Sequence, residues 1–299
     1  MRLWPRAPLA PFTTIGVGGR ADLLVSVGVP EALETVLDVL VSTEVPFAVV
    51  GAGSNLLVAD GGYHGVVVKL EEGFHYVDPP ETAGGALVAG AGLPLPRLAT
   101  YAADAGLSGL EWSCGIPGTV GGGVAMNAGA HGVCMADVVE ALELVGPGGT
   151  GWVTADELEW SYRHVELPPA TIVTAVRLGL RPGGRDEVLA RHRSLLRLRR
   201  QSQPRGVRTF GSAFRNPQGG SAGRLLEAAG VKGLRRGGAE VSHVHANFIA
   251  NVGEATCADV LILMGMMRDT VRQRFDVVLE PEVRLLGAPF PWEGGTARN

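Results

Sequence analysis

Cysteine is scarce in this chain, and the spacing of the few cysteines excludes two kinds of site. Three cysteines, Cys114, Cys134 and Cys257, occur in 299 residues, and none of them belongs to a C-x-x-C pair. Three thiols cannot all pair with one another, so the pattern indicates neither a disulfide framework nor a thiolate zinc site. A reducing compartment suits such a chain, and we expect the cytoplasm.

Long hydrophobic runs and an excess of positive charge are also missing. No apolar run approaches the ~20 residues of a membrane-spanning helix, and prolines at positions 5, 8 and 11 interrupt the N-terminal segment. The 30 Asp and Glu residues outnumber the 26 Lys and Arg residues, which argues against the dense basic face that nucleic acids and anionic membranes require. With 46% hydrophobic residues, the composition indicates a globular protein with neither kind of partner.

Glycine, by contrast, is abundant. The chain has 44 glycines in 299 residues, about twice the usual share of ~7%. They cluster in short apolar contexts between strand-like runs, unlike the even spacing of a flexible linker. We therefore expect turns and places where the backbone approaches a ligand closely.

The first 72 residues predict a strand, a helix and a second strand, followed by two further strands. Pro30 lies in the first turn of the predicted helix, and Glu31 lies close to its N-terminus, where a negative charge stabilises the helix dipole. No helix fits between residues 51 and 66, so a glycine segment joins strand to strand. The predicted elements are strands at 21–27, 45–50, 56–59 and 66–70 and a helix at 30–42.

The rest of the chain predicts an α+β fold with a linker at residues 181–184. Gly106 stops one helix, and Asp259 follows Thr256 at the capping-box spacing of another. We expect helices at 94–105, 186–201, 221–229 and 256–275, and strands at 138–145, 172–180, 244–252 and 277–286. The predicted division is 1–72 and 73–182 as two lobes of one domain and 183–299 as a second domain.

The glycine segment at residues 51–56 begins like a dinucleotide-binding fingerprint but lacks two of its parts. Leu56 occupies the position of the third glycine, and no helix follows whose N-terminus would carry a pyrophosphate. What remains is a loop whose backbone N–H groups, with the Ser54 hydroxyl and the Asn55 amide, form an anion-binding nest. An ordinary tight turn is the alternative.

A second glycine segment covers residues 115–123, where five of nine residues are glycine. So many glycines are costly in chain entropy and supply no core side chains, so close approach to a bulky ligand is the simplest explanation. Two such segments can grip a dinucleotide. The alternative is a glycine-rich connection between lobes.

Three side chains are candidates for chemistry. Arg163 is either a surface arginine or a bidentate clamp for a carboxylate or phosphate. Ser212, between Gly211 and Ala213, lacks the Gly-x-Ser-x-Gly pattern of a hydrolase, so it is either a turn hydroxyl or a rigidly held donor. Glu282 lies opposite Val283 in an apolar strand, which suits either a solvated face or a cleft carboxylate.

Two further patterns have ordinary explanations. His243 and His245 are spaced as on one strand face, but no third ligand is evident, so we expect no metal. The arginines of the helix at 186–201 are typical of a solvated face, and they attract a phosphorylated substrate only if they border a cleft.

Taken together, the motifs resemble those of one family, UDP-N-acetylenolpyruvoylglucosamine reductase, also called UDP-N-acetylmuramate dehydrogenase. Seven motifs occur in the family order between about residues 12 and 287. They are Gly-Ala-Gly-Ser-Asn-Leu-Leu (51–57), Gly-Ile-Pro-Gly-Thr-Val-Gly-Gly (115–122), Asn-Ala-Gly-Ala-His-Gly (127–132), Tyr-Arg (162–163), Gly-Ser-x-Phe-x-Asn-Pro (211–217), Gly-Val-Lys-Gly (230–233) and Leu-Glu-Pro-Glu-Val-Arg (279–284).

The resemblance implies a fold and two nucleotide ligands. The fold is an FAD-binding domain of the p-cresol methylhydroxylase and vanillyl-alcohol oxidase type in two lobes, with a C-terminal α+β domain for the substrate. FAD is the cofactor and NADPH the co-substrate. The residues implied to bind FAD are Gly51, Ala52, Gly53, Ser54, Asn55, Leu56, Ile116, Pro117, Gly118, Thr119, Gly121, Gly122, Asn127 and Gly129.

The resemblance also implies a role for each candidate side chain. Ser212 is the proton donor, and Arg163 and Glu282 assist the reduction of an enolpyruvyl sugar nucleotide. Substrate binding is implied for Tyr162, Arg215, Asn216 and Lys232.

The chain departs from the family pattern in three places. Arg215 stands where the family often has lysine, no serine follows the Tyr162–Arg163 pair, and no inserted segment carries a substrate-covering tyrosine. We expect the compact form of the family, acting as a monomer on small molecules. The alternatives are another FAD-dependent oxidoreductase of the same fold and a non-enzymatic nucleotide-binding protein.

Overall fold

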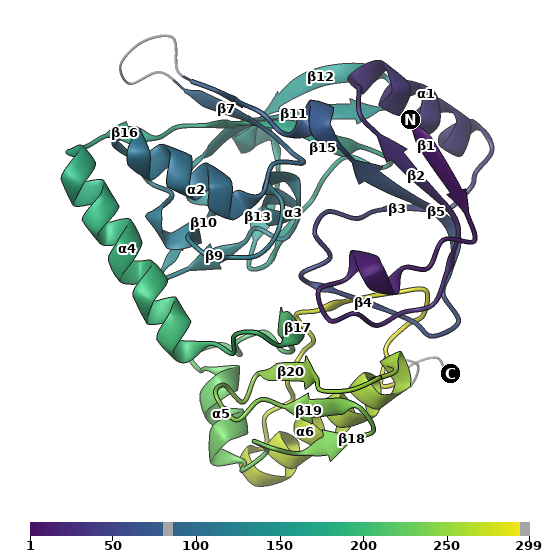
Figure 1. Cartoon of the computed structure of the whole chain (residues 1–299), viewed down its shortest axis with the longest axis vertical. Coiled ribbons are helices and arrows are strands. Elements are labelled where there is room, and N and C mark those ends of the chain that lie inside the picture. Colours follow the sequence, from purple (N-terminus) through teal and green to yellow (C-terminus); the bar gives the residue numbers. More distant parts are fainter. Residues whose placement is uncertain (80–85, 294–299) are drawn as a thin grey trace. The chain divides into compact units, whose positions relative to one another are not determined.

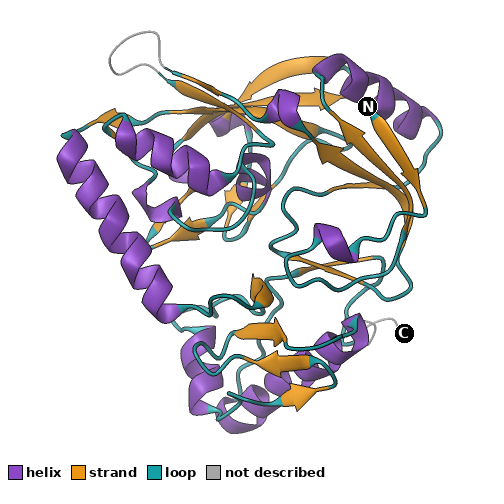
Figure 2. Ribbon diagram, viewed as in Figure 1, coloured by secondary structure: helices purple, strands orange, loops and turns teal. Residues whose placement is uncertain are grey.

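The computed structural model describes residues 1–79 and 86–293, and contacts within the chain divide it into two compact units. The first unit comprises Met1–Trp4, Leu24–Ala52 and Gly65–Arg199. The second unit comprises Pro5–Leu23, Gly53–His64 and Arg200–Asn299. Figure 1 labels the elements along the chain, and Figure 2 distinguishes helices from strands.

The first sheet begins with the predicted strand–helix–strand unit. Its strand order is β1-β2-β5-β3, and β3 and β5 pair in parallel. The strands are β1 (Arg2–Pro5), β2 (Ala21–Val27), β5 (Tyr63–Leu70) and β3 (Phe47–Val49). Helix α1 (Pro30–Ser42) buries Leu33, Leu37 and Leu40, the spacing of one apolar face in a helix. The predicted bounds of β2 and α1 are confirmed.

The five-stranded sheet of the first unit has the order β12-β11-β15-β7-β6, and its neighbours pair antiparallel. The five consecutive residues 172–176 of β15 are all buried, as expected of a strand covered on both faces. Helix α3 (Val120–Ala125) packs against β7 and β15. The strands are β12 (Gly149–Thr154), β11 (Val139–Gly146), β15 (Ile172–Leu178), β7 (Leu87–Gly90) and β6 (Val77–Asp78).

Three helices and three short strand pairs complete the first unit. The helices are α2 (Leu95–Asp104), α3 (Val120–Ala125) and α4 (Arg185–Ser202), whose last residues lie in the second unit. The pairs join β8 (Leu107–Ser108) to β16 (Arg181–Pro182), β9 (Gly129–Ala130) to β10 (Val133–Cys134), and β13 (Trp160–Ser161) to β14 (His164–Val165). Short 3₁₀ helices cover Ala10–Phe12 in the second unit and Glu72–Phe74, Glu111–Ser113, Met135–Asp137 and Ala155–Glu157 in the first.

The second unit contains a four-stranded sheet of order β17-β20-β19-β18 and two helices. Helix α6 packs against β18 and β19, and α5 packs against α6 (Figure 1). A separate parallel pair joins β4 (Leu56–Val58) to β21 (Arg284–Leu286). The elements are β17 (Arg208–Ser212), β20 (Phe248–Asn251), β19 (Ala239–Val241), β18 (Arg235–Arg236), α5 (Ala222–Ala228) and α6 (Cys257–Phe275).

Helix α6 begins as the sequence predicts and has a second cap that the sequence does not reveal. Thr256 and Asp259 form the predicted capping box. In addition, the Asp60 carboxylate accepts the backbone N–H groups of Cys257 at 2.8 Å and Ala258 at 2.9 Å. Burial and the nearby Asp60 charge raise the pKa of the Cys257 thiol to about 12. This cysteine is therefore a protonated core residue.

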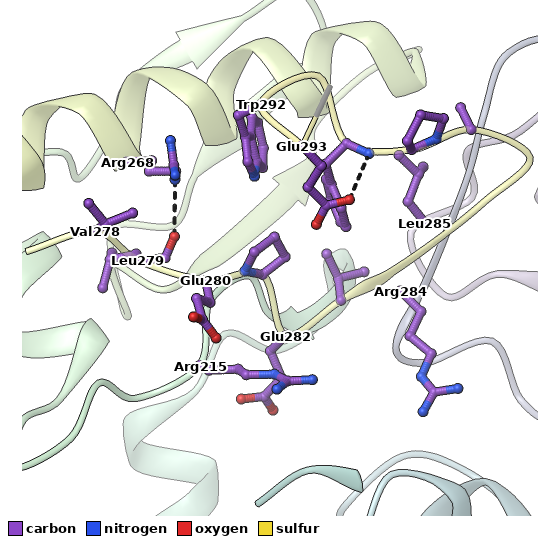
Figure 3. Close-up of a pocket in the computed structure, with 15 residues that line it drawn as sticks. Arg215, Arg268, Val278, Leu279, Glu280, Glu282, Arg284, Leu285, Trp292 and Glu293 are labelled. Atoms are coloured by element: carbon purple, nitrogen blue, oxygen red, sulfur yellow. Dashed lines mark hydrogen bonds between the residues drawn. The ribbon is translucent and has the colours of Figure 1, made fainter. Parts of the chain in front are cut away.

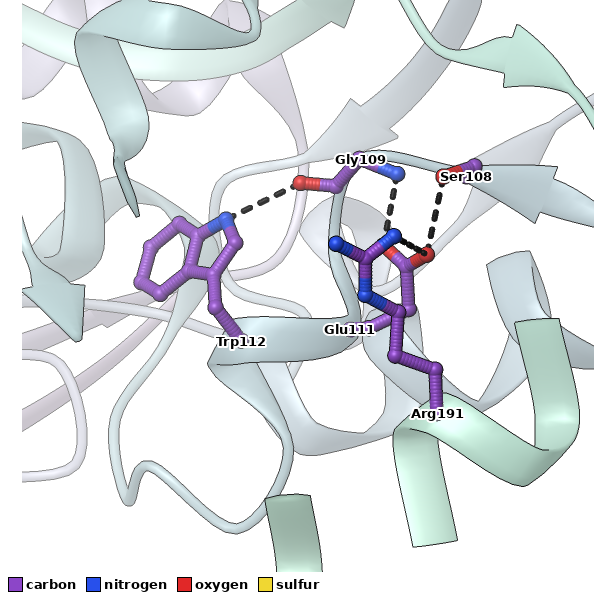
Figure 4. A network of polar contacts seen from close by, with 5 residues as sticks. All are labelled: Ser108, Gly109, Glu111, Trp112 and Arg191. Carbon is purple, nitrogen blue, oxygen red and sulfur yellow. Dashed lines mark hydrogen bonds and ion pairs between the residues drawn. The ribbon is translucent and has the colours of Figure 1, made fainter. Parts of the chain in front are cut away.

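A buried glutamate ties α4 to the turn after β8 in the first unit (Figure 4). Glu111, only 6% exposed, accepts hydrogen bonds from the Ser108 hydroxyl at 2.8 Å and the Gly109 N–H at 2.7 Å. Its carboxylate lies 4.0 Å from the Arg191 guanidinium of α4. Burial alone raises the pKa of Glu111, but the backbone and Ser108 hydrogen bonds and the Arg191 charge together hold it below its ordinary value.

The structure departs from the predicted elements in the glycine-rich stretch and near the C-terminus. Helix α3 lies inside the glycine-rich stretch, where Thr119 caps it and it buries Val120 and Val124. The predicted strand at 277–286 is wrong for residues 277–283: only 284–286 form a strand, preceded by a single bridge at Pro281. Proline has no N–H to donate, which limits regular pairing there. The predicted strand at 244–252 shortens to β20.

The compact units also cross the predicted domain boundaries. Residues 5–23 and 53–64 belong to the same unit as the C-terminal part of the chain, whereas residues 185–199 of α4 belong to the first unit. The division at 72 and 182 stays a prediction. Of the helices in the described ranges 1–79 and 86–293, none is long and apolar enough to cross a membrane.

Candidate functional site

The two glycine segments meet within the first unit. A Cβ atom on Gly51, just after β3, would lie 2.5 Å from the Thr119 hydroxyl oxygen, a distance that no side chain tolerates. That hydroxyl also accepts the N–H of Gly122 at 3.2 Å. Gly118 has φ +145°, a backbone conformation that favours glycine. The two segments thus pack directly against each other, and the contact with Thr119 requires glycine at position 51.

Residues 53–56 of the first glycine segment belong to the second unit. Contacts within that unit explain the residue types of Gly53 and Asn55. Gly53 has φ +63°, and a Cβ atom there would lie 2.0 Å from the carbonyl oxygen of Phe12. The Asn55 amide donates to the Glu282 carbonyl oxygen at 3.0 Å, and the Asn55 carbonyl accepts the Arg284 N–H at 3.0 Å. The Asn55 amide, which we expected in an anion-binding nest, therefore holds the backbone of Glu282.

Arg163 lies at the turn between β13 and β14, in the first unit. Its backbone is left-handed, with φ +61°, and its Nη2 atom donates to the Gly129 carbonyl oxygen at 3.0 Å. Its guanidinium carbon lies 4.9 Å from the centre of the Tyr162 ring. The buried Asn127 holds the same turn, because its Nδ2 donates to the Ser161 carbonyl oxygen at 2.9 Å. Arg163 is thus anchored to Gly129, six residues beyond the second glycine segment.

Ser212 ends β17 in the second unit, after an irregularity in the strand. The register between β17 and β20 shifts between Thr209 and Ser212, where Gly211 adopts φ +86°. Ser212 then pairs with Phe248 and is half-buried. A shift of this kind redirects a side chain at the end of a strand.

The structure brings the backbone of Ser212 and Glu282 together, although 70 residues separate them. The Glu282 N–H donates to the Ala213 carbonyl oxygen at 2.9 Å, and the Arg215 N–H donates to the Glu280 carbonyl oxygen at 2.8 Å. Glu282 is half-buried and Glu280 is exposed, while Val283 is buried on the other side. Glu282 and Val283 therefore differ in burial, although residues 277–283 do not form the predicted strand.

A pocket of about 760 Å³ adjoins this segment in the second unit (Figure 3). Its charged lining residues are three arginines and three glutamates. Arg268 donates to the Leu279 carbonyl oxygen at 3.1 Å, and its guanidinium lies 5.6 Å from the Trp292 ring. The charged lining comprises Arg215, Arg268, Arg284, Glu280, Glu282 and Glu293.

The two remaining predicted substrate residues already have partners within the second unit. The Asn216 side chain accepts the Ala222 N–H at 3.0 Å, near the start of α5. The Lys232 ammonium pairs with the Glu227 carboxylate and lowers the pKa of that carboxyl. Neither residue lines the pocket beside Glu282.

One residue near these candidates is not among those predicted, and another makes contacts that its predicted role does not include. Asn247 is buried, and its carboxamide bonds to both backbone groups of Phe214. An asparagine in an apolar, strand-like run is a signal, since strands disfavour it. Asn127 was expected to bind the cofactor, but its side chain serves the Arg163 turn and the Ala136 N–H.

Comparison with known proteins identifies the class and then the family. Residues 21–154 match the model of an FAD binding domain, and residues 203–286 match the model of the UDP-N-acetylenolpyruvoylglucosamine reductase C-terminal domain. An FAD-binding domain followed by a reductase domain defines a flavin-dependent oxidoreductase.

Relatives match nearly the whole chain. UDP-N-acetylenolpyruvoylglucosamine reductase of Anaeromyxobacter sp. (strain Fw109-5) is 49% identical over 94% of this chain and 87% of its own length. The enzyme of Granulibacter bethesdensis is 44% identical over 97% of this chain and 92% of its own length. The solved structure of the Thermus caldophilus reductase has a TM-score of 0.84 at 42% identity, over 96% of this chain and 99% of that one. The chain belongs to the UDP-N-acetylenolpyruvoylglucosamine reductase family, which confirms the resemblance, the α+β class and the FAD-binding domain.

Proposed function

We propose that the protein is an FAD-dependent reductase that uses NADPH to convert the enolpyruvyl group of UDP-N-acetylglucosamine enolpyruvate to a lactyl ether. The product, UDP-N-acetylmuramate, serves peptidoglycan synthesis. Within the family, the observation that carries the proposal is the backbone pairing of the Ser212 segment with the Glu282 segment, because it places a hydroxyl and a carboxylate on adjacent, rigid chain.

The glycine segments are the proposed FAD site. The contact between Gly51 and Thr119 supports it by bringing the two segments side by side, and the positive φ of Gly118 supports it because that backbone conformation favours glycine. When bound, FAD supplies hydride transfer, first from NADPH and then to the enolpyruvyl β-carbon. The proposed contacts are Gly51, Ala52, Gly53, Ser54, Asn55, Leu56, Ile116, Pro117, Gly118, Thr119, Gly121, Gly122, Asn127 and Gly129.

The reduction of an enolpyruvyl group requires a cation and an acid from the protein. Hydride addition at the β-carbon leaves negative charge at the α-carbon, delocalised into the carboxylate. The planar guanidinium of Arg163 suits that carboxylate, because it offers two parallel N–H donors. The Ser212 hydroxyl delivers the proton to the α-carbon, and Glu282, in its protonated form, donates a hydrogen bond to the developing enolate or relays the proton. Atoms and charge then balance as one hydride and one proton.

The substrate carries a diphosphate and a carboxylate, so further cations are required. We assign Tyr162, Arg215, Asn216 and Lys232 to substrate binding. Arg215 lines the pocket beside Glu282, and Lys232 would exchange its Glu227 partner for a substrate oxygen. We further propose that the protein acts as a monomer in the cytoplasm, with no nucleic acid as partner.

The absorption spectrum of the purified protein, followed by anaerobic titration, tests this proposal. A yellow protein should lose its flavin absorbance with NADPH and regain it when the enolpyruvyl sugar nucleotide is added. A colourless protein that binds no FAD would contradict the enzyme assignment. If oxygen restores the absorbance as fast as the sugar nucleotide does, the protein is instead an oxidase of the same fold.

A further inference from the structure

Phe214 lies in the Ser212 segment, residues 212–215, and determines how this segment is aligned with the Glu282 segment, residues 280–282. Its neighbours Ala213 and Arg215 bond to the strand of Glu280 and Glu282. In an antiparallel pair, successive residues direct their backbone groups to opposite sides. The N–H and C=O of Phe214 therefore point away from Glu282, into the interior, where Phe214 is fully buried.

Asn247 satisfies both of these buried groups with one side chain. Its Oδ1 accepts the Phe214 N–H at 3.0 Å, and its Nδ2 donates to the Phe214 carbonyl oxygen at 2.8 Å. Its own carbonyl oxygen accepts the Ala213 N–H at 2.8 Å. Asn247 is 3% exposed, so water does not replace these bonds.

The carboxamide takes the place of a missing strand neighbour. β20 begins at Phe248, the partner of Ser212, and the chain before it turns away, because the Phe248 N–H bonds to the His245 carbonyl oxygen at 3.0 Å. Phe214 forms a bridge with Pro281 on one side, and on the side of β20 its N–H and C=O meet the Asn247 side chain. A carboxamide carries one donor and one acceptor, like a peptide group, and so extends the ladder by one residue.

We propose that Asn247 is a positioning residue for proton transfer, acting through the backbone of residues 212–215. This inference rests on the proposed function, in which Ser212 is the donor. By holding the Phe214 backbone, Asn247 determines where Ser212 lies at the end of β17. Because the Ala213 carbonyl oxygen accepts the Glu282 N–H, it also determines the position of Glu282 along the paired segment. Without the carboxamide, the buried groups of Phe214 gain partners only by a shift of this segment.

Asn247→Asp is the most direct test, because it keeps the shape and removes the donor. The carboxylate would still accept the Phe214 N–H but would repel the Phe214 carbonyl oxygen. In the FAD-bound enzyme, stopped-flow flavin reduction by NADPH should stay within about 2-fold of the parent rate. Reoxidation by the enolpyruvyl sugar nucleotide should slow by about 10- to 100-fold, the effect expected of a misplaced reacting group.

Asn251→Asp, at the end of the strand that follows Asn247, provides a matched control. Its carboxamide donates to the Ile15 carbonyl oxygen at 3.0 Å and accepts the N–H groups of Gly253 and Ala255, each at 3.2 Å. These bonds resemble those of Asn247 in kind but do not involve the Ser212 segment. Both half-reactions should remain within about 2-fold. Equal selective slowing in this variant would overturn the inference.

A double-mutant cycle separates positioning from general damage. If Asn247 acts through Ser212, Asn247→Asp should slow reoxidation by less than about 2-fold once Ser212→Ala is present. Multiplied effects would overturn the inference. If Ser212→Ala alone leaves the rate of reoxidation unchanged, the proposed role of Ser212 fails. If Ser212→Ala slows reoxidation but Asn247→Asp does not, only the inference about Asn247 is refuted. Should Asn247→Asp not yield FAD-bound enzyme, Asn247→Ser, whose hydroxyl serves one of the two groups, undergoes the same comparison.

Discussion

Two regions of the molecule each place a proposed reactive side chain on a turn or strand end that a buried asparagine holds. In the first unit, Asn127 joins the Ser161 carbonyl to the Ala136 N–H and so supports the turn of Arg163. In the second unit, Asn247 gives both of its polar atoms to one residue, Phe214. The first asparagine bridges two segments, whereas the second replaces a strand.

The difference lies in what holds the reactive group itself. Arg163 lies in a hairpin of six residues, from Trp160 to Val165, and its side chain donates its own hydrogen bond to the Gly129 carbonyl oxygen. The position of Ser212 depends instead on main-chain pairing with residues about 35 and 70 positions away. A side chain that is anchored directly should tolerate the loss of its supporting asparagine better than one positioned only through its backbone.

The largest effect is expected where the second region delivers its proton. Ser212→Ala should slow flavin reoxidation by the enolpyruvyl sugar nucleotide by roughly 10² or more, since general acid catalysis contributes about that much. Flavin reduction by NADPH should change little. Stopped-flow absorbance of the two half-reactions measures both rates.

Ser221→Ala is the control for that experiment. Ser221 also lies in the second unit, and its hydroxyl caps α5 by accepting the Arg224 N–H at 3.4 Å. It should lower stability slightly and leave both half-reactions unchanged. Equal slowing of the two half-reactions in Ser212→Ala would count against a proton donor and indicate a disturbed flavin site.

Arg163→Lys tests the first region and should have the next largest effect. Lysine keeps the charge but lacks the planar fork and cannot reproduce the guanidinium bond to Gly129 in the same position. We expect reoxidation to slow by roughly 10- to 100-fold. Complete loss of a charge-stabilising donor costs more, up to about 10³-fold. Steady-state kinetics and stopped-flow measure it, and unchanged kinetics would remove Arg163 from the site.

Asn127→Asp compares the two asparagines directly and should have a smaller effect than Asn247→Asp. The substitution removes the donor to Ser161, but Arg163 retains its own bond to Gly129. On FAD-saturated enzyme we expect reoxidation to slow by about 2- to 5-fold, the size of one hydrogen bond of ~0.5–1 kcal/mol. A loss equal to or greater than that of Asn247→Asp would break the contrast between the regions.

The helices of the molecule differ in how far the sequence predicts them. Local signals were sufficient for α1, where Pro30 and Glu31 mark the start, and for the capping box of α6. The sequence does not predict the short helix α3 because glycine has a low helix propensity, and burial of Val120 and Val124 together with the Thr119 cap stabilises it. Local patterns report on neighbours within a few residues and no further.

The sites reflect the same limit. The residue types of Arg163, Ser212 and Glu282 were predicted from motifs, but the pairing of the Ser212 and Glu282 segments was not, because it joins residues 70 positions apart. The Asn55 amide was expected to face a nucleotide and instead holds the Glu282 carbonyl, 227 residues away. The Asp60 cap on α6 likewise depends on tertiary contact. Long-range partners of polar groups are decided by packing.

The smallest effect concerns acid stability in the first unit, where Glu111 links α4 to the turn after β8. The native state lowers the pKa of Glu111 below its ordinary value of 4.5, so the unfolded chain binds a proton that the folded one does not. This stabilisation is complete above about pH 4.5 and is lost as the pH falls through the lower, folded pKa. Glu111→Gln should therefore lower the free energy of unfolding by about 1–2 kcal/mol at pH 7, and the difference from the parent should shrink below pH 4.5.

Arg191→Gln is the matched change on α4: its guanidinium is 69% exposed and 4.0 Å from the carboxylate, so it should cost less than ~0.5 kcal/mol. Denaturant unfolding followed by amide exchange in α4, at pH 7 and pH 4, measures both variants. A Glu111→Gln difference that persists unchanged at low pH would show that shape, not charge, holds this helix.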